Sequence, residues 1–535
     1  MTAAVAVRRD RTIEWRRVLA PLGGLTVLFV AWTVASQTMF RSKHAIPTPW
    51  AVFAKMADDL AFYRPHVRQT LGEAGWGYLW GNLAAFGVGA VFVVAPIIER
   101  LTLRLVVAVY CLPLIATAPI LQIIFAGDRA KIAVASQSVF FTTLVGVTLG
   151  LRSADPALLA VVRAHGGGSL HQLLRVRLRA AIPGVFSGLK IAAPAAVLGA
   201  VIGEFLGGRR GIGVAMIASQ QSFNVTRTWG LGIVLTVLSA TVYVLTGWLG
   251  KRLAPWEATS TSLTEMLGSA GGRGPLPIRI AVSLAYLVAS IVIVLLAWSW
   301  ALRIFNLNNF FAKTPGDVWT FLTGPSGASN RTVLIKDLRF TLTNAALGYL
   351  AGTAGALLLA VVVAGNRVVE QAVMPVAIAL RSVPLVAMTP LVALIFGRGL
   401  ACVLVIAGIV TFFPSLVQLV DGLRSAPKPA YDVVSAFGGD SRQQLLRVRL
   451  PYALPSLFAS ARVAAPLAIV GATLAEWLAT GKGIGNHMVL ALSRSRYTDL
   501  WASVAVLTAC AVTIYGIAAA LEGVVLRRFA GANRT

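Results

Sequence analysis

One segment of this chain occurs twice. Residues 150–213 align without a gap with residues 422–485, at a constant offset of 272 positions, and about half of the aligned residues are identical. Scattered identity continues upstream, where Thr70 matches Thr341 at an offset of 271. A repeat of this length predicts two copies of one structural unit within a single chain.

Apolar runs of membrane-spanning length surround the repeat. A hydrocarbon core about 30 Å thick takes about 20 apolar residues per helix, and the chain offers about twelve such runs, six in each half. They lie near 19–37, 74–97, 104–126, 131–150, 186–206, 229–250, 278–303, 341–364, 371–396, 400–420, 456–478 and 499–523. We therefore expect an all-α polytopic membrane protein built from two tandem six-helix repeats. An even number of spans in each half gives both halves the same orientation, so a parallel pseudo-dimer follows.

Composition and charge agree with this class. Hydrophobic residues make up 57% of the chain and charged residues only 13%, against about 25% charged in an average soluble domain. The net charge of +27 is carried by Lys and Arg in short loops between apolar runs, so we expect no nucleic-acid partner. The bias of these cations predicts that both termini are cytoplasmic.

A polar segment divides the two halves. Residues 251–277 are rich in Gly, Ser, Thr and Pro, a composition typical of a linker. The expected domains are a first unit over 1–250, a cytoplasmic linker over 251–277 and a second unit over 278–535.

The identity between the halves is highest in a polar loop, at 150–185 and again at 421–456. Lipid does not constrain such a loop, so a protein partner is the expected reason for its pattern. In the second copy we predict a short helix from about 429 to 437 that carries Asp432 and ends at Gly438-Gly439. A rigid, partly apolar surface projection of this kind suits docking into a groove.

This loop resembles the signature of binding-protein-dependent ABC importer permeases, in which an acidic residue, a Gly six residues later and a downstream Leu-Pro keep fixed spacing. The resemblance implies a coupling helix seated in a separate cytoplasmic ATPase. The loop occurs twice, which implies two ATPase copies that bind the ATP and Mg. The resemblance assigns coupling roles to residues of both copies: Ala160, Arg163 and Gly166, and Asp432, Ser435, Gly438, Leu450 and Pro451. The first copy departs from the pattern, with Ala160 at the acidic position and Arg179 in place of Pro451.

The same resemblance implies an extracytoplasmic substrate-binding protein and a lipid environment, namely the inner membrane of a bacterium. Pro47-Thr48-Pro49 and Thr314-Pro315 are similar to the Pro-rich entry of the nitrate, sulfonate and taurine permeases. The implied cargo is a small anionic or heterocyclic solute. A secondary transporter with twelve helices and no ATPase partner is the alternative, although the spans carry few carboxylates for coupling an ion.

Two equivalent carboxylates stand near the ends of the fifth spans. Glu204 and Glu476 precede Gly-Ile-Gly in each half, and ionisable groups at membrane depth are functional by default. A role in the pathway or gate and a role as an interfacial anchor both remain open. The sequence contains no P-loop, HExxH, GxSxG or CxxC motif, so we expect neither an enzyme nor a metal site, and no cofactor bound by this chain.

Overall fold

The computed structural model describes residues 29–38, 46–95, 114–254, 276–304, 306–366 and 385–530, besides a few single positions. Within these ranges the chain forms helices and no strand, and eight helices are long and apolar enough to cross a membrane. The all-α polytopic class is confirmed. The predicted spans 19–37, 104–126 and 371–396 lie partly outside the described residues, so the full number of twelve stays a prediction.

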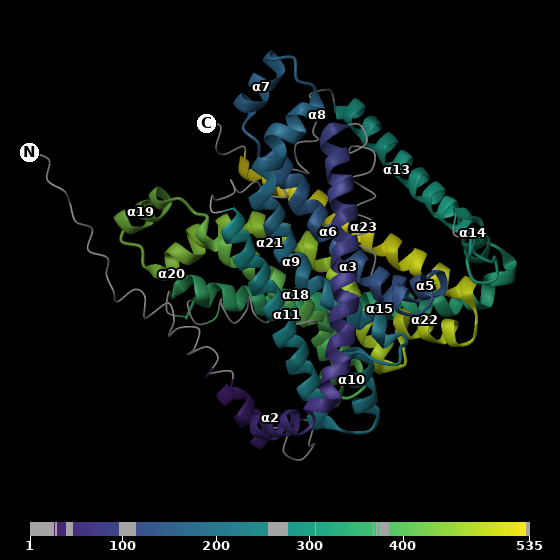
Figure 1. Cartoon of the computed structure of the whole chain (residues 1–535). Helices are drawn as coiled ribbons and strands as arrows, with labels where there is room; N and C mark the ends of the chain where they lie inside the picture. The colour runs from purple at the N-terminus through teal and green to yellow at the C-terminus, as the bar shows by residue number, and fades with distance from the viewer. Residues whose placement is uncertain are drawn as a thin grey trace, which may run out of the picture.

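The helices follow one another in the same order in both halves (Figure 1). The first half contains α2 (Pro49–Asp58), α3 (Leu60–Val94), α5 (Leu114–Ile124), α6 (Asp128–Arg152), α7 (Pro156–Ala164), α8 (Ser169–Gln172), α9 (Leu178–Phe205), α10 (Ile212–Gln221) and α11 (Val225–Leu253). The second contains α13 (Leu276–Ile304), α14 (Pro315–Thr323), α15 (Ala328–Gly365), α17 (Leu385–Phe396), α18 (Leu400–Arg424), α19 (Lys428–Ala436), α20 (Ser441–Gln444), α21 (Leu450–Ala475), α22 (Gly483–Ser493) and α23 (Tyr497–Ala530). From α2 and α14 onward, each described helix of the first half has a counterpart in the second, which supports the tandem repeat.

Each half is built around three long helices. In the first half α6 packs against α3 and α9, and in the second half α18 packs against α15 and α21. Gly146 and Gly150 of α6 meet Gly184 and Gly188 of α9 so closely that a Cβ at Gly146 would lie 2.7 Å from the Gly188 Cα. Small residues spaced four apart let helix backbones approach in a membrane, where packing rather than the hydrophobic effect drives association.

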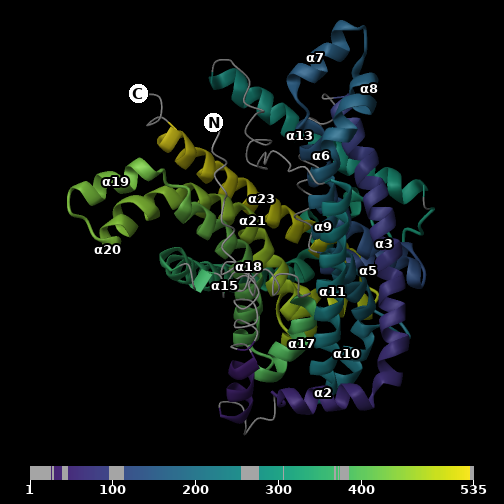
Figure 2. The same cartoon turned by 60° about the vertical axis from the view of Figure 1, so that its left-hand side comes forward.

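The two halves share one apolar core. Its buried residues come from both halves, among them Ile115, Val197, Cys402 and Leu474. The equivalent helices α5 and α17 each pack against the last helices of the other half: α5 contacts α21, α22 and α23, and α17 contacts α9, α10 and α11. Figure 2 shows α17 beside α10. The interface between the halves is therefore reciprocal.

The helix α3 differs from the prediction at its start. It begins at Leu60 rather than near residue 74 and runs for 35 residues, about 52 Å at 1.5 Å per residue, far more than the hydrocarbon needs. Residues 76–94 carry no charge and span about 28 Å, close to the hydrocarbon thickness. The polar residues before Trp76 thus continue the helix beyond the apolar layer, where an apolar-run criterion cannot detect it.

Candidate functional site

Two helical hairpins, α7–α8 and α19–α20, project from the bundle at separate places (Figures 1 and 2). None of these four short helices contains a buried residue. Each hairpin continues into a five-residue π-helical turn, Leu173–Arg177 and Leu445–Arg449, before the long helix α9 or α21. A π-turn shifts the register of a helix and occurs often at functional sites.

Paired glycines end the first helix of each hairpin in the same way. Gly166 and Gly438 have φ of +75° and +72°, the left-handed conformation typical of a helix C-terminus. The next amides close the turn, since Gly167 N–H donates to Val162 O at 2.9 Å and Gly439 N–H to Val434 O at 2.8 Å. A Cβ at Gly439 would stand 2.4 Å from the Val434 side chain. Both glycines are needed to fold the chain back.

The two hairpins are held by different polar contacts. In the first, the Asp155 carboxylate caps α7 by accepting from Ala157 N–H at 2.8 Å. In the second, the Ser435 hydroxyl lies 3.0 Å from the Gln444 amide, which donates to it and joins α19 to α20. Arg449 donates to Ala364 O at the end of α15 at 2.6 Å, which fixes the base of the second hairpin.

The predicted coupling residues divide into two groups. Those on the hairpins are exposed: Ala160, Arg163, Gly166, Asp432, Ser435 and Gly438. Leu450 and Pro451 are half-buried at the start of α21, so they support the hairpin from its base. The predicted helix 429–437 coincides with α19 to within one residue.

Apolar side chains on the hairpins face solvent. In the first hairpin Leu158, Val161 and Leu170 are each more than half exposed, and in the second Phe437 is 89% exposed beside Val433. Exposed apolar residues on a projection that is otherwise polar are typical of a docking surface. These residues were not among those that the signature pattern identified.

The two glutamates lie inside their own halves, each bound to a threonine and to a backbone amide. Glu204 is 1% exposed and accepts from the Thr70 hydroxyl at 2.6 Å and from Gly213 N–H at 2.6 Å. The Thr70 hydroxyl also accepts from Ile212 N–H at 2.9 Å. The cluster ties the start of α10 to α3 and α9.

The second half repeats this cluster. Glu476 accepts from the Thr341 hydroxyl at 2.7 Å and from Gly485 N–H at 3.1 Å, and Thr341 accepts from Ile484 N–H at 2.9 Å. A Cβ at Gly483 would lie 2.2 Å from the Glu476 carboxyl carbon, so only glycine fits there. We call each set of Thr, Glu and helix-start amides a glutamate clamp. Sequence analysis assigned no role to Thr70 or Thr341. Their equivalence in the repeat was the one signal that could have identified them.

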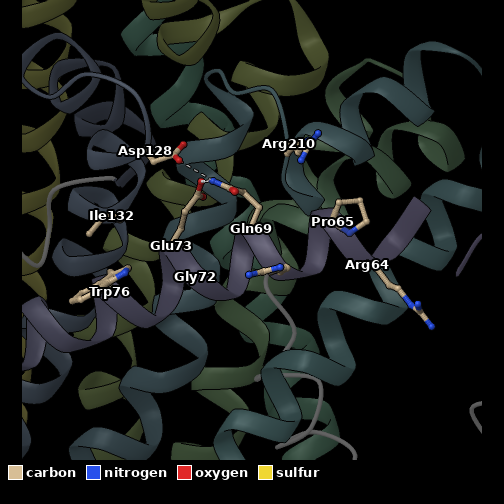
Figure 3. Close-up of a pocket in the computed structure, with 10 residues that line it drawn as sticks. Arg64, Pro65, Gln69, Gly72, Glu73, Trp76, Asp128, Ile132 and Arg210 are labelled. Atoms are coloured by element: carbon tan, nitrogen blue, oxygen red, sulfur yellow. Dashed lines mark hydrogen bonds between the residues drawn. The ribbon is translucent and has the colours of Figure 1, made fainter. Parts of the chain in front are cut away.

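A cluster of buried ion pairs accompanies the clamp of the first half. The Lys131 ammonium lies 2.8 Å from the Glu73 carboxylate, both nearly fully buried, and 3.0 Å from Asp128. The Gln69 amide donates to Glu73 at 2.8 Å and to Asp128 at 3.0 Å. Dashed lines mark hydrogen bonds among these residues in Figure 3. The equivalent positions of the second half are Val403, Asn344, Leu400 and Phe340, which cannot form ion pairs.

Comparison with known proteins gives a consistent result. Residues 77–259 and 352–531 match the family model described as "Binding-protein-dependent transport system inner membrane component". A probable ABC transporter permease protein of Haemophilus influenzae is 30% identical over 183 residues, which are 34% of this chain and 75% of the relative. The formylaminopyrimidine transport permease protein of Halalkalibacterium halodurans is 27% identical, over 37% of this chain and 79% of its own length. The taurine transport system permease protein of Escherichia coli is 24% identical, over 46% and 95% respectively.

Proposed function

Because this chain belongs to the binding-protein-dependent inner membrane components, as an ABC transporter permease with two permease units in one chain, we propose that its two hairpins are its contacts with cytoplasmic ATPase subunits. The observation that carries the proposal is the duplicated hairpin, whose glycine turn is the same in both copies while its apolar side chains stay exposed. Two hairpins imply two ATPase copies per chain, which bind the ATP and Mg.

The proposed orientation follows from these contacts. Both hairpins lie on the cytoplasmic side, and so do the two termini and the linker over 251–277. An extracytoplasmic binding protein then delivers the solute to the opposite side of the inner membrane. Relatives named for formylaminopyrimidine and taurine transport support a small heterocyclic or anionic cargo. The alternative of a secondary transporter is set aside, because the family transports with a binding protein.

Isolation of the intact complex tests the ATPase contacts. The tagged full chain, purified from its own host in mild detergent, should bring an ATPase at two copies per chain by native mass spectrometry. The chain alone should not turn over ATP. Replacement of Phe437 or Val161 by Asp should release the ATPase, whereas the same change at Phe223, which is 84% exposed in the loop between α10 and α11, should not and is the control. ATP turnover by the pure chain, or full ATPase retention by both hairpin variants, would contradict the proposal.

The glutamates are proposed as parts of the outer gate. Each clamp fixes the start of α10 or α22, and these helices contact α17 and α5 of the opposite half, respectively. A clamp that loosens would therefore move the interface between the halves. Cysteines introduced at Leu206 and Leu478, two residues after the glutamates, leave the clamps intact and report their separation by crosslinking. Absence of crosslinks in every nucleotide state, with normal transport by the Glu204→Gln/Glu476→Gln variant, would favour the anchor role.

A further inference from the structure

A cavity of about 640 Å³ opens in the first half at the outer surface of α3. Its lining residues are Arg64, Pro65, Arg68, Gln69, Gly72, Glu73, Trp76, Asp128, Ile132 and Arg210. They come from the first turns of α3, the start of α6 and the loop before α10 (Figure 3). Because α6 starts here and ends three residues before the cap of α7, the cavity and the first hairpin lie on opposite sides of the membrane. Its size is within the usual range for small-ligand sites.

The cavity carries positive charge that the described part of the chain does not neutralise. Its two carboxylates, Glu73 and Asp128, are both bound to Lys131. Arg68 and Arg210 are exposed, and no ion pair of either is found among the described residues. Figure 3 shows Arg210 on the same side of α3 as Gln69 and Asp128, whereas Arg64 points away from them. Lys131 offsets part of the charge of the two carboxylates, and the guanidinium groups of Arg68 and Arg210 are left to favour an anionic ligand.

The depth of the cavity matches the membrane interface. Trp76 lines the cavity and is 54% exposed. It begins the uncharged stretch 76–94, whose length matches the thickness of the hydrocarbon core. Trp side chains concentrate at the boundary between hydrocarbon and headgroups. Arg68 stands eight residues before Trp76, about 12 Å further along the helix axis, at the level of lipid phosphates.

The cavity opens towards lipid rather than towards the interface between the halves. Trp76 shares an exposed stripe of α3 with Trp80 and Leu83, which are 56% and 51% exposed, and these large apolar side chains require a lipid contact. Along the membrane normal, the apolar side chains lie towards the hydrocarbon core and the guanidinium groups lie towards the aqueous phase. An anionic phospholipid has the same arrangement, since its acyl chains lie in the core and its phosphodiester lies at the surface.

The second half lacks the residues of this site. Phe340, Leu347 and Leu400 occupy the positions equivalent to Gln69, Trp76 and Asp128. Arg339 and Lys482 occupy the positions equivalent to Arg68 and Arg210. A second cavity in the described residues lies elsewhere, around α13 and α14. The repeat therefore does not duplicate this feature.

We propose that this cavity binds the phosphodiester headgroup of one anionic phospholipid in the leaflet opposite to the hairpins, with Arg68 and Arg210 as the phosphate ligands and Trp76 against the start of the acyl chains. Arginine suits this role because its planar donors match phosphate oxygens. A free phosphate ion shares the ligand chemistry but not the apolar part, so the two sources can be distinguished.

Native mass spectrometry of the intact chain tests the site. The chain is released from nanodiscs of pure phosphatidylcholine and titrated with short-chain phosphatidylglycerol, with phosphatidylcholine, and with inorganic phosphate. We expect one tightly retained phosphatidylglycerol per chain, retention at least tenfold weaker for the Arg68→Ala/Arg210→Ala variant, and unchanged retention for the matched variant Arg339→Ala/Lys482→Ala of the second half. Thermal unfolding of both variants without lipid controls for misfolding.

Three outcomes would overturn the proposal. Equal retention by the two double variants would show that the cations of the first half bind no lipid. Binding of inorganic phosphate as strong as that of phosphatidylglycerol would assign the site to a free anion. Loss of binding-protein affinity by the Arg68→Ala/Arg210→Ala variant in pure phosphatidylcholine, without a change in lipid retention, would assign the patch to protein docking.

Discussion

At the scale of single residues, each glutamate clamp joins a buried carboxylate to a threonine hydroxyl and to a backbone amide at a helix start. Thr70→Val and Thr341→Val keep the side-chain shape but leave a buried carboxylate and a helix-start amide without their hydroxyl partner. Each should lower the free energy of unfolding by about 1–3 kcal/mol. The matched control Thr241→Val removes only a hydroxyl that donates to Val237 O on an exposed helix face. Thermal unfolding in detergent measures the difference, and equal melting temperatures for all three variants would refute the clamp.

The hairpin glycines permit a separate residue-scale prediction. Gly166 and Gly438 share a left-handed φ, and a Cβ added at either would meet nothing within 4 Å, so valine should strain both by a similar amount, about 1–2 kcal/mol. A difference in function then reflects the partner surface. Because Asp432 and Pro451 keep the signature and the first copy does not, Gly438→Val should reduce transport-coupled ATP hydrolysis more than Gly166→Val. Equal losses in proteoliposomes at equal expression would mean that the departures do not matter.

At the scale of elements, the close crossing of α6 and α9 determines how the first half packs. Gly146→Leu or Gly188→Leu would push a side chain into backbone that is already in contact, and overpacking of this kind costs about 1–3 kcal/mol or more. Gly87→Leu is the control, since a Cβ there meets nothing within 4 Å. Yield and monodispersity after detergent extraction should fall for the first two variants only. Normal behaviour of Gly146→Leu would show that the crossing can open without cost.

The same elements show what sequence reasoning can and cannot reach. Apolar runs and the repeat predicted the long helices, the order of elements and the helix α19, because each of these signals is a pattern of consecutive residues. The start of α3 was missed because its first turns are polar and lie beyond the hydrocarbon. The Thr70 contact with Glu204 joins residues 134 positions apart, and no local pattern encodes such a pairing. The cavity beside α3 likewise depends on three separate segments that meet only in the folded chain.

At the scale of the whole molecule, the reciprocal packing of α5 and α17 makes each half incomplete alone. Expressed by itself, the segment 1–254 would expose the buried face of α5, including Ile115 and Ala116, which are 1% and 0% exposed in the full chain. We expect it to be degraded or to aggregate, and to be rescued by co-expression of residues 276–535. Pulse-chase labelling compares their half-lives. A long-lived, monodisperse first half would show that the shared core is dispensable.

The covalent joining of the two halves has a genetic consequence. In a permease assembled from two identical chains, every mutation appears on both sides of the axis, and a change that helps one side must be tolerated by the other. Here a mutation is expressed once. Glu73, Lys131 and Asp128 form an ion-pair cluster in the first half, whereas the residue equivalent to Lys131 in the second half is Val403. A fused gene can acquire such a change in one half alone, but a homodimer cannot.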